Sequence, residues 1–432
     1  MTPEIKQRIE QIRRGEEPEG YQYTRYGIYP ISWVVKRVGD CIEEYRELSN
    51  DIQSFPVYSS SRKGLMPQSE YYDQKKAKET NLGYKIVPNG YVTYRHMSDD
   101  DVFHFNINHT GNDILVSSEY PVFTSVNGTD LGFLIPALNY TARFRYFCRT
   151  QKLGGTRTRL YLNNLSQYRL GVPSFKEQQK IAAILTTQDE VIELKEKRLA
   201  EKLRQKKYLM QQLLTGKKRL PGFSGQWEIK GFNQVFTFGA TNTFSRECMC
   251  EDSTGVKNIH YGDILVRYGE VLKLSEQEIP SLLSDIGAKI TTFVDDGDVV
   301  IADTAEDLTA GKVVEVQETH GKKVAAGLHT MLCKPIKGCF APGWLGYYMN
   351  SETYHKQLVP YITGVKVMSI SKGNIVKTHI LVPPIEEQTA IVKVFSTTDR
   401  EIDLLRQDIE QEKQKKKALM QMLLTGIVRV NV

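Results

Sequence analysis

Apolar side chains recur at alternating four- and three-residue steps along two long stretches of this chain. That spacing places them on one side of a helix, which is the pattern of a coiled coil. Each stretch therefore predicts one long helix that carries an apolar seam. The seam residues are Ile181, Leu185, Ile192, Leu199, Leu209 and Leu213 in the first stretch, and Ile391, Phe395, Ile402, Leu405, Ile409, Leu419 and Leu423 in the second.

The two stretches are copies of one another. Residues 172–216 align with residues 382–426 at a constant offset (382 − 172 = 210), with eighteen identities over forty-five positions and no gap. Register kept over this length indicates an internal duplication. A helix this long cannot bury its seam alone, so we expect the two copies to pack on each other. Two separate helices, each within its own core, are the alternative.

Both predicted helices carry signals for their ends. Ser174 and Glu177 form an S-x-x-E capping box at the first start. Pro384 stands at the second start, where proline suits the first turn. Each copy closes on Thr-Gly, which places Gly216 and Gly426 where a left-handed C-terminal cap is expected.

Two blocks of strand-like sequence accompany the helices. Segments such as DILVSS and DVVIAD alternate or run apolar between turns rich in Gly, Asn and Asp. Trp33 opens the first block and Trp227 the second. We therefore predict an α+β chain in which two globular α/β domains are separated by a pair of long helices. Its segments are an N-terminal helix in 1–20, a domain in 21–171, a long helix in 172–219, a second domain in 220–381 and a second long helix in 382–432.

The net charge of +6 is unevenly placed along the 432 residues. Residues 176–219 hold twelve Lys and Arg against six Asp and Glu, whereas residues 386–429 hold eight of each. The whole excess therefore lies on the first long helix. A basic helix could contact phosphate or an acidic partner. A solvated face rich in lysine is the alternative.

The apolar runs and the cysteine spacing narrow the class of protein further. The charged N-terminal sequence lacks an apolar core of signal-peptide length, and no run approaches a transmembrane span, so we expect a cytoplasmic protein that does not enter a membrane. Cys248 and Cys250 form C-x-C, and Cys333 and Cys339 follow. Neither spacing matches a zinc site, so we expect reduced cysteines and no metal.

Catalytic motifs are missing from the sequence. There is no phosphate-binding G-x-x-x-x-G-K-S/T, no Asn/Asp-Pro-Pro-Tyr/Phe tetrapeptide and no G-x-S-x-G. Asp189, Glu193 and Lys195 imitate a nuclease D…E-x-K pattern, but they lie inside the first predicted helix, where successive positions point in different directions. The sequence therefore favours recognition over catalysis.

The repeated segments resemble a known family. VPSFKEQQKIAAIL with LMQQLLTGKKRLPGF, and VPPIEEQTAIVKVF with LMQMLLTG, resemble the two conserved regions of the DNA-specificity subunit of type I restriction-modification systems. The first block, through FPVYSSSRKGL and GGTRTRLYLNNL, and the second, through DDGDVVIADTAEDLTAGKVVEV, resemble target-recognition domains of that family. The resemblance covers nearly the whole chain. A departure is Ala302-Asp303-Thr304-Ala305, where many relatives carry a more basic or hydroxyl-rich turn.

The resemblance implies a non-catalytic subunit that recognises DNA. Each domain would read one half of a bipartite site in double-stranded DNA, and an antiparallel helix pair would fix the gap at about one turn of the duplex. The implied partners are two modification subunits, which methylate adenine and dock on the helix pair, and translocating restriction subunits. S-adenosylmethionine, ATP and Mg would be used by those partners, with no cofactor bound by this chain.

Two other functions remain open at this point. The first is a coiled-coil scaffold that holds two partner proteins and never contacts DNA. It predicts no salt-dependent DNA affinity even in the full complex. The second is a free-standing nuclease or methyltransferase, which would need activity in the purified chain.

Side chains that read bases are expected at strand ends and in loops, where Arg, Lys, Asn, Gln, Ser and Thr can reach the groove. Gly154 and Gly155 suggest a hinge just before one such group. Ordinary surface charge is the alternative for each candidate. The DNA-binding candidates are Ser60, Arg62, Lys63, Arg95, His96, Arg157 and Arg159 in the first block, and Tyr261, Arg267, Asp303, Thr304, Lys312 and Lys366 in the second.

Overall fold

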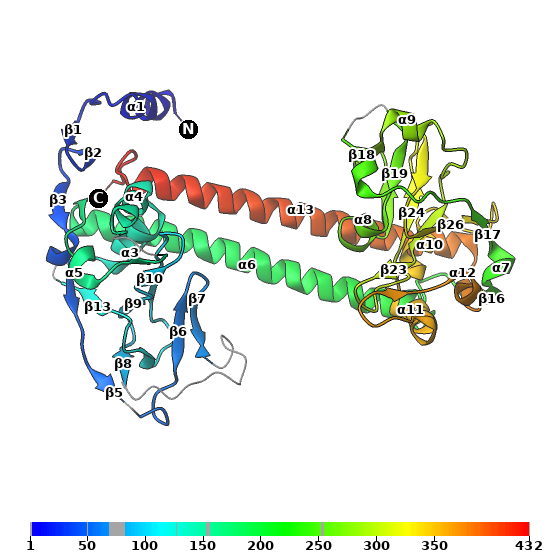
Figure 1. Cartoon of the computed structure of the whole chain (residues 1–432), viewed down its shortest axis with the longest axis horizontal. Coiled ribbons are helices and arrows are strands. Elements are labelled where there is room, and N and C mark those ends of the chain that lie inside the picture. Colours follow the sequence, from blue (N-terminus) through cyan, green and yellow to red (C-terminus); the bar gives the residue numbers. More distant parts are fainter. Residues whose placement is uncertain are drawn as a thin grey trace. The chain divides into compact units, whose positions relative to one another are not determined.

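The computed structural model describes residues 2–49, 51–68, 83–126, 128–152, 156–251 and 255–431. The chain divides into two compact units, one formed by Met1–Glu196 with Gln407–Val432 and the other by Lys197–Arg406 (Figure 1). Each unit contains one globular domain and one half of each long helix. Among the described residues, no helix is both long and apolar enough to cross a membrane.

The domain of the first unit is mostly antiparallel sheet. Its sheets have the strand orders β11-β9-β13-β4 and β12-β8-β5, with a separate β6–β7 hairpin. The elements of this unit ahead of the long helix are α1 (Pro3–Arg13), β1 (Tyr21–Thr24), β2 (Gly27–Pro30), β3 (Val34–Arg37), η1 (Val38–Asp40), β4 (Ile42–Glu44), β5 (Leu48–Ser49), β6 (Tyr58–Ser61), β7 (Gly64–Pro67), β8 (Tyr84–Val87), β9 (Val92–Tyr94), β10 (Met97–Ser98), β11 (Phe105–Ile107), β12 (Ile114–Ser117), β13 (Val122–Ser125), α3 (Leu131–Tyr140), α4 (Ala142–Thr150), β14 (Thr158–Arg159), α5 (Leu162–Leu165) and β15 (Arg169–Val172).

The domain of the second unit is built on a five-stranded sheet of order β17-β26-β22-β24-β20, beside a four-stranded sheet of order β18-β21-β19-β25. Its elements are β16 (Glu228–Gly231), α7 (Phe232–Val235), β17 (Phe236–Gly239), η2 (Arg246–Cys248), β18 (Met249–Cys250), β19 (Lys257–Ile259), α8 (Tyr261–Val266), β20 (Val271–Lys273), β21 (Ser281–Leu282), α9 (Ser284–Gly287), β22 (Val299–Ala302), β23 (Thr304–Ala305), β24 (Val313–Gln317), β25 (Val324–Ala326), β26 (Thr330–Pro335), α10 (Trp344–Met349), α11 (Glu352–Leu358), η3 (Val359–Tyr361), β27 (Met368–Ser369), α12 (Lys372–Ile375) and β28 (His379–Val382).

Aromatic side chains dominate the core of the first domain. Tyr94 of β9 and Phe105 of β11 are cross-strand partners whose ring centroids lie 4.5 Å apart. The predicted opening residue, Trp33, is buried and meets Phe133 of α3 edge-on at 6.0 Å. Such pairs add to the free energy gained from burying their large apolar surface. The start of the first long helix packs against this same core.

The central strand of the second domain is apolar on both faces. All four residues of β22, Val-Val-Ile-Ala, are buried. Val299 and Ile301 face one cluster, which includes Trp344, while Val300 and Ala302 face another. A strand covered on both sides reads as a continuous apolar run rather than an alternating one. This explains why DVVIAD marks the middle of the sheet.

The duplication extends ahead of the long helices. β14, α5 and β15 recur as β27, α12 and β28 at the same offset (368 − 158 = 210). In each domain the strand before the long helix pairs antiparallel with the strand that directly follows Trp33 or Trp227, β15 with β3 and β28 with β16. The parts that differ between the domains lie between these repeated elements.

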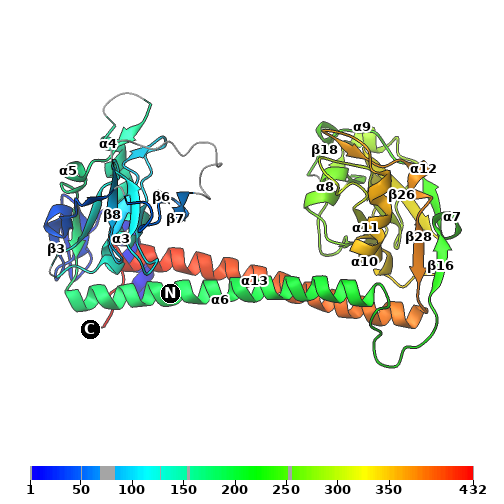
Figure 2. The ribbon, with the colours of Figure 1, turned by 90° about the horizontal axis from the view of Figure 1, so that it is seen from below.

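The two predicted long helices are present as α6 (Phe175–Leu213) and α13 (Ile385–Leu423), each of 39 residues. In the first unit, Ile181 at the start of α6 shares a core with Leu423 at the end of α13. In the second unit, Leu213 at the end of α6 shares a core with Ile391 near the start of α13. The helices therefore pair antiparallel within each unit, as predicted, and Figure 2 shows them side by side.

The seam residues lie on the buried side of both helices. Those at the two ends of each helix pack with the domain cores as well as with the other helix. Fully buried are Ile181, Leu185, Ile192, Leu213, Ile391, Phe395, Ile402, Ile409 and Leu423, and half-buried are Leu199, Leu209, Leu405 and Leu419.

Polar residues in the seam set the register of the pair. In the first unit Gln188 Nε2 donates to Glu412 Oε2 at 2.8 Å, and Lys195 Nζ lies 2.8 Å from Asp408 Oδ1. In the second unit Lys202 Nζ lies 2.6 Å from Glu401 Oε2. Apolar contacts alone tolerate sliding, whereas these directional bonds specify one alignment. Two lysines of the basic helix α6, Lys195 and Lys202, are thus paired with acidic residues of α13.

Glu412 is expected to make the helix pair of the first unit less stable in acid. Bonds from Lys195 and Gln188 lower the pKa of its carboxyl from 4.5 to about 2. Because the folded-state pKa is the lower one, the stabilisation is complete above about pH 4.5 and is lost as the pH falls toward about 2. Urea unfolding of the wild type and of Glu412→Gln checks this: the difference in stability at about pH 7 should shrink at about pH 3. An equal difference at both values would contradict it.

The capping box at the start of α6 forms only in part. Ser174 Oγ accepts the backbone N–H of Glu177 at 3.3 Å, as predicted. The Glu177 carboxylate, however, accepts hydrogen bonds from Arg429 Nε and Nη2 at 2.6 and 2.8 Å instead of reaching back to its own helix end. A charged donor forms a stronger bond than a backbone amide. The start of α6 is therefore fastened to the segment after α13.

The second unit repeats this bond with the two helices exchanged. Glu387, 210 residues after Glu177, is buried and accepts Arg219 Nη2 at 2.6 Å and Trp227 Nε1 at 2.9 Å. Both helices end as predicted, with Gly216 at φ +68° and Gly426 at φ +73°. A Cβ on Gly426 would lie 2.6 Å from Pro30, so glycine is required there for space as well as for backbone conformation.

Candidate nucleic-acid interface

A glutamine near the start of each long helix joins the helix to its domain. Gln178 Oε1 accepts the backbone N–H of Asp130, and Gln388 Oε1 accepts that of Ala341, both at 2.9 Å. Each amide nitrogen also donates to the carbonyl of the proline five residues earlier. All four hydrogen bonds lie in the interior or at its margin, where unsatisfied polar groups are unfavourable. The repeated glutamine of each long helix therefore holds its domain against the start of that helix.

Both domains carry a short two-stranded ladder at equivalent places. β10 pairs with β14 in the first domain, and β23 pairs with β27 in the second. In the first domain the carbonyl of His96, just before β10, accepts the backbone N–H of the residue just after β14 at 2.8 Å. In the second domain the carbonyl of Asp303, just before β23, accepts the backbone N–H of the residue just after β27 at 2.9 Å. Two candidate residues in domains of unlike sequence thus occupy corresponding positions.

The ladder of the first domain brings candidate arginines together around an acidic loop. Arg157 Nε donates to Asp99 Oδ1 at 2.8 Å. Arg62, in the turn between β6 and β7, pairs with Asp100. Arg159 of β14 is exposed two residues after Arg157. The side chains of Arg62 and Arg157 are 57% and 52% exposed, so both guanidinium groups reach solvent.

The loop itself is held in one conformation. The hydrogen bond from Arg62 is the main reason that the pKa of Asp100 lies below its ordinary value. Asp101 accepts the hydroxyl of Thr158 and adopts φ +62°, which is uncommon for a residue other than glycine. The lowered pKa keeps the Asp100 carboxylate ionised at neutral pH, and it holds the Arg62 side chain in place.

Two candidates of the first domain lie inside it. Ser60 is 3% exposed, and its Oγ accepts Asn106 Nδ2 at 2.7 Å. His96 is 2% exposed and stacks on Tyr161 with ring centroids 5.4 Å apart. Burial lowers the pKa of His96, which favours its neutral form. Neither side chain reaches the surface of the domain, because both are buried.

The remaining candidates of this domain, Lys63 and Arg95, differ in exposure. Lys63 is exposed next to Arg62 in the β6–β7 turn, and Arg95 is half-buried after β9. Gly154 and Gly155, the suggested hinge, lie outside the described residues.

The ladder of the second domain borders a cluster of histidine and tyrosine. Thr304 Oγ1 donates to Asp303 Oδ1 at 2.7 Å, and His329 Nδ1 lies 3.6 Å from the same oxygen. The Tyr261 ring meets His329 edge-on at 5.3 Å and lies 4.6 Å from the His260 ring. The structure therefore brings together three sequence candidates and two histidines.

Neither histidine is among the candidates selected from the sequence. His329 adopts φ +53°, uncommon for a residue with a side chain, and is half-exposed. His260 accepts the backbone N–H of Gly262 at 3.2 Å, and burial followed by the nearby charge of Arg246 lowers its pKa. The two histidines are 69 residues apart (329 − 260 = 69) and meet only through the folded sheet, so no sequence spacing signals them.

The last three candidates differ in accessibility. Arg267 is exposed at the end of α8, with Nη2 donating to the carbonyl of Glu278 at 3.4 Å. Lys366 is exposed in the loop before β27. Lys312 instead donates to the carbonyl of Leu265 at 2.9 Å, and burial lowers the pKa of its ammonium group. The ammonium group of Lys312 is thus used in a hydrogen bond within the domain, whereas Arg267 and Lys366 are exposed to solvent.

Comparison with known proteins gives this architecture a family. Residues 54–205 and 225–414 each match the sequence profile of the type I restriction modification DNA specificity domain. The chain therefore belongs to the family of type I restriction-modification DNA-specificity proteins. It is a specificity subunit with two specificity domains, and the α+β fold with a duplicated helix pair expected from the resemblance is confirmed.

One relative covers nearly the full length of the chain. The chain is 23% identical to the type I restriction enzyme MjaX specificity subunit of Methanocaldococcus jannaschii, over 95% of this chain and 97% of that protein. It is 25% identical to the MjaVIII specificity subunit of the same organism, over 61% and 62%. Its fold resembles a chain from a structural study of complex assembly and conformational transition in a type I R-M system (TM-score 0.57, 14% identity, covering 94% of this chain and 100% of that one). It also resembles the S subunit from M. genitalium (TM-score 0.51, 10% identity, 93% and 97%).

Proposed function

We propose that each domain of this specificity subunit reads one half of a bipartite site in double-stranded DNA, and that the helix pair sets the gap between the halves. The observation that supports this most directly is the pair of equivalent ladders, carried by unlike domains on two copies of one helix. Unlike reading surfaces at equivalent positions suit a site with two different halves.

In the first domain the DNA-contacting residues are Arg62, Arg157 and Arg159. Guanidinium groups bind phosphate and the guanine edge with two parallel hydrogen bonds. An exposed ion pair such as Arg157 with Asp99 contributes only about 0–1 kcal/mol to stability. Breaking it so that Arg157 can bind DNA therefore costs little binding free energy. The acidic loop would hold these side chains extended before DNA arrives.

In the second domain the chemistry is different. The Asp303 carboxylate can accept a hydrogen bond from an exocyclic amino group of a base, while Lys366 suits a phosphate. Thr304 and Tyr261 border the same surface. A half-site read through an acidic group would differ in sequence from one read through arginines.

The helix pair would also dock the modification subunits. Leu194 and Leu404 are 64% and 56% exposed and occupy equivalent positions on the two helices (404 − 194 = 210). A duplicated apolar residue on the outside of a helix pair suits two copies of one partner. Methylation with S-adenosylmethionine belongs to these partners, and ATP and Mg belong to the restriction subunits, so this chain contributes recognition and no catalysis.

Arg157→Ala tests the assignment of the first domain. In cells that also make the modification subunits, the affinity of the complex for its site should fall about 5- to 150-fold, with base preference relaxed in one half-site only. Sequencing of methylated adenines across the genome reads both halves at once. Lys366→Ala is the control in the other domain, and it should weaken methylation with little change in base preference.

A scaffold without DNA contact would give another result. Methylation would then be insensitive to both substitutions, and the assembled complex would show no salt-dependent affinity for DNA. That outcome would overturn the proposal.

A further inference from the structure

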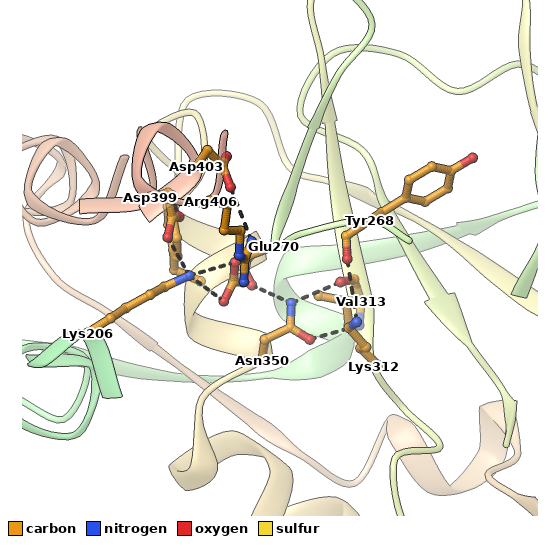
Figure 3. A network of polar contacts seen from close by, with 11 residues as sticks. Lys206, Tyr268, Glu270, Lys312, Val313, Asn350, Asp399, Asp403 and Arg406 are labelled. Carbon is orange, nitrogen blue, oxygen red and sulfur yellow. Dashed lines mark hydrogen bonds and ion pairs between the residues drawn. The ribbon is translucent and has the colours of Figure 1, made fainter. Parts of the chain in front are cut away.

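One ammonium group joins the second domain to both long helices. Lys206 of α6 lies between Asp399 of α13 and Glu270, which directly precedes β20 in the domain (Figure 3). Its Nζ donates to Glu270 Oε1 and Oε2 at 2.8 and 2.9 Å and lies 2.6 Å from Asp399 Oδ1. The Lys206 side chain is 13% exposed. All three donors of the ammonium group are therefore used, each on a carboxylate oxygen.

The carboxylates of this network are held from the domain side as well. Tyr347 of α10 donates its hydroxyl to Asp399 Oδ2 at 2.7 Å, and its ring lies 5.6 Å from Lys206 Nζ. The carbonyl of Glu270 accepts the backbone N–H of Glu315 in β24 at 3.0 Å. A force on Glu270 is thus transmitted to the central sheet.

That sheet leads directly to the proposed reading surface. β24 pairs with β22, and β22 runs through Ala302 into Asp303 and Thr304 at the ladder. A short path therefore connects Lys206 with the residues assigned to the second half-site. It runs from the Lys206–Glu270 ion pair through the backbone hydrogen bond of Glu270 with β24 and the pairing of β24 with β22. Packed sheets deform little, because their interiors are close-packed.

The equivalent lysine of the first unit lacks this connection. Lys416, 210 residues after Lys206, pairs with Asp189 of α6 and lies 5.8 Å from the ring of Tyr140. Among the ion pairs of the described residues, Asp189 is its carboxylate partner, and Asp189 belongs to a helix. The lysine bond to a domain carboxylate is a feature of the second unit.

We infer that the Lys206–Glu270–Asp399 network fixes the position of the second domain along the helix pair and thereby sharpens the choice of gap length. This rests on the proposed function, in which the helix pair spans the gap. Each added base pair moves a half-site by about 3.4 Å along the duplex and rotates it by about 34°. A domain held only by apolar contacts could slide or tilt to follow it, whereas directional charged bonds resist that movement.

Glu270→Ala separates this role from helix pairing. The substitution removes the domain carboxylate but leaves Lys206 paired with Asp399, so α6 and α13 stay joined. The assembled complex is titrated with duplexes whose two half-sites are unchanged and whose gap is native, one base pair shorter or one longer. The preference for the native gap should fall about tenfold. Base preference within each half-site should stay as in the wild type, which loss of folding would not produce.

Lys202→Met is the matched control. Lys202 lies four residues before Lys206 on α6, and its carboxylate partner among the ion pairs of the described residues is Glu401 of α13, not a carboxylate of the domain. Its variant should keep the wild-type gap preference, because the bonds from Gln188 and Lys195 to α13 still hold the register of the helix pair. Glu270→Gln, which keeps the shape and removes the charge, should relax gap preference in the same direction as Glu270→Ala.

Two results would overturn the inference: gap preference that stays sharp in both Glu270 variants, or equal relaxation in Lys202→Met. Absence of any affinity of the wild-type complex for paired half-sites would instead reject the proposed function. The two failures are therefore distinguishable.

Discussion

Arg219→Ala is expected to lower the free energy of unfolding of the second unit by about 3–5 kcal/mol, the range for breaking a buried ion pair by removing one partner. Glu387 is completely buried, and its carboxylate is held by Arg219 and by Trp227 Nε1. Without the arginine, one hydrogen bond from an indole remains for a buried negative charge. Urea unfolding of the full chain measures the loss, with tryptophan fluorescence reporting on Trp227 and Trp344 of the second unit and on Trp33 of the first.

The neighbouring Lys218 provides the control for this substitution. It lies in the same segment, with Nζ donating to the hydroxyl of Tyr208, and both side chains are exposed. Lys218→Ala should change stability by less than about 0.5 kcal/mol. Adding Glu387→Gln to Arg219→Ala should recover part of the loss, because the buried charge is then removed. A cost in the double variant as large as in the single variant would contradict the ion-pair explanation.

Lengthening both long helices by four residues is expected to lengthen the gap in the DNA site. Four residues add about 6 Å of helix, which corresponds to about two base pairs at 3.4 Å each. They also rotate the following residues by about 40°, so each seam stays on nearly the same side. The insertions belong after residues 196 and 406, so that the polar bonds on either side keep their alignment. Methylated adenines mapped in cells making this variant report the gap.

Two controls accompany this insertion. Four residues added to the linker after Gly222, outside both helices, should leave the gap unchanged. Four residues added to α6 alone should destabilise the pair, because bonds such as Lys195 to Asp408 would no longer align with the opposite helix. An unchanged gap in the doubly lengthened protein, with both half-sites still read, would show that the helix pair is not the spacer.

The long helices were accessible to sequence reasoning because their pattern is local and repeated. A four-and-three spacing over 39 residues has no competing explanation in strand geometry, and the Thr-Gly endings marked the left-handed caps at Gly216 and Gly426. The capping box predicted at the start of α6 is present only in its Ser174 half. Glu177 had the expected residue type at the expected spacing, but a guanidinium from the far end of the other helix binds its carboxylate in place of the local amide.

The candidate interface was less accessible. Arg62 and Arg157 were chosen from turns far apart in sequence, and the structure brings both to the loop of Asp99 and Asp100, with Arg159 exposed two residues after Arg157. Ser60 and Lys312 carry the same kinds of polar group, yet hydrogen bonds inside the domain take them up. Residue type and a nearby turn do not distinguish an exposed donor from one that satisfies a buried carbonyl.

The sequence by itself determined the duplication, the two helices with their seams, and the division into two unlike domains, because periodicity and repetition are properties of neighbouring positions. Only the tertiary structure decided which charges meet. The crossed pairs of Glu177 with Arg429 and Glu387 with Arg219 join residues more than a hundred positions apart. The bond from Lys206 to Glu270 spans 64 positions and was also decided by the tertiary structure, since Glu270 lies in the part of the chain that the duplication does not repeat. Such contacts depend on how the chain returns on itself, and that path follows from the packing of the apolar seams.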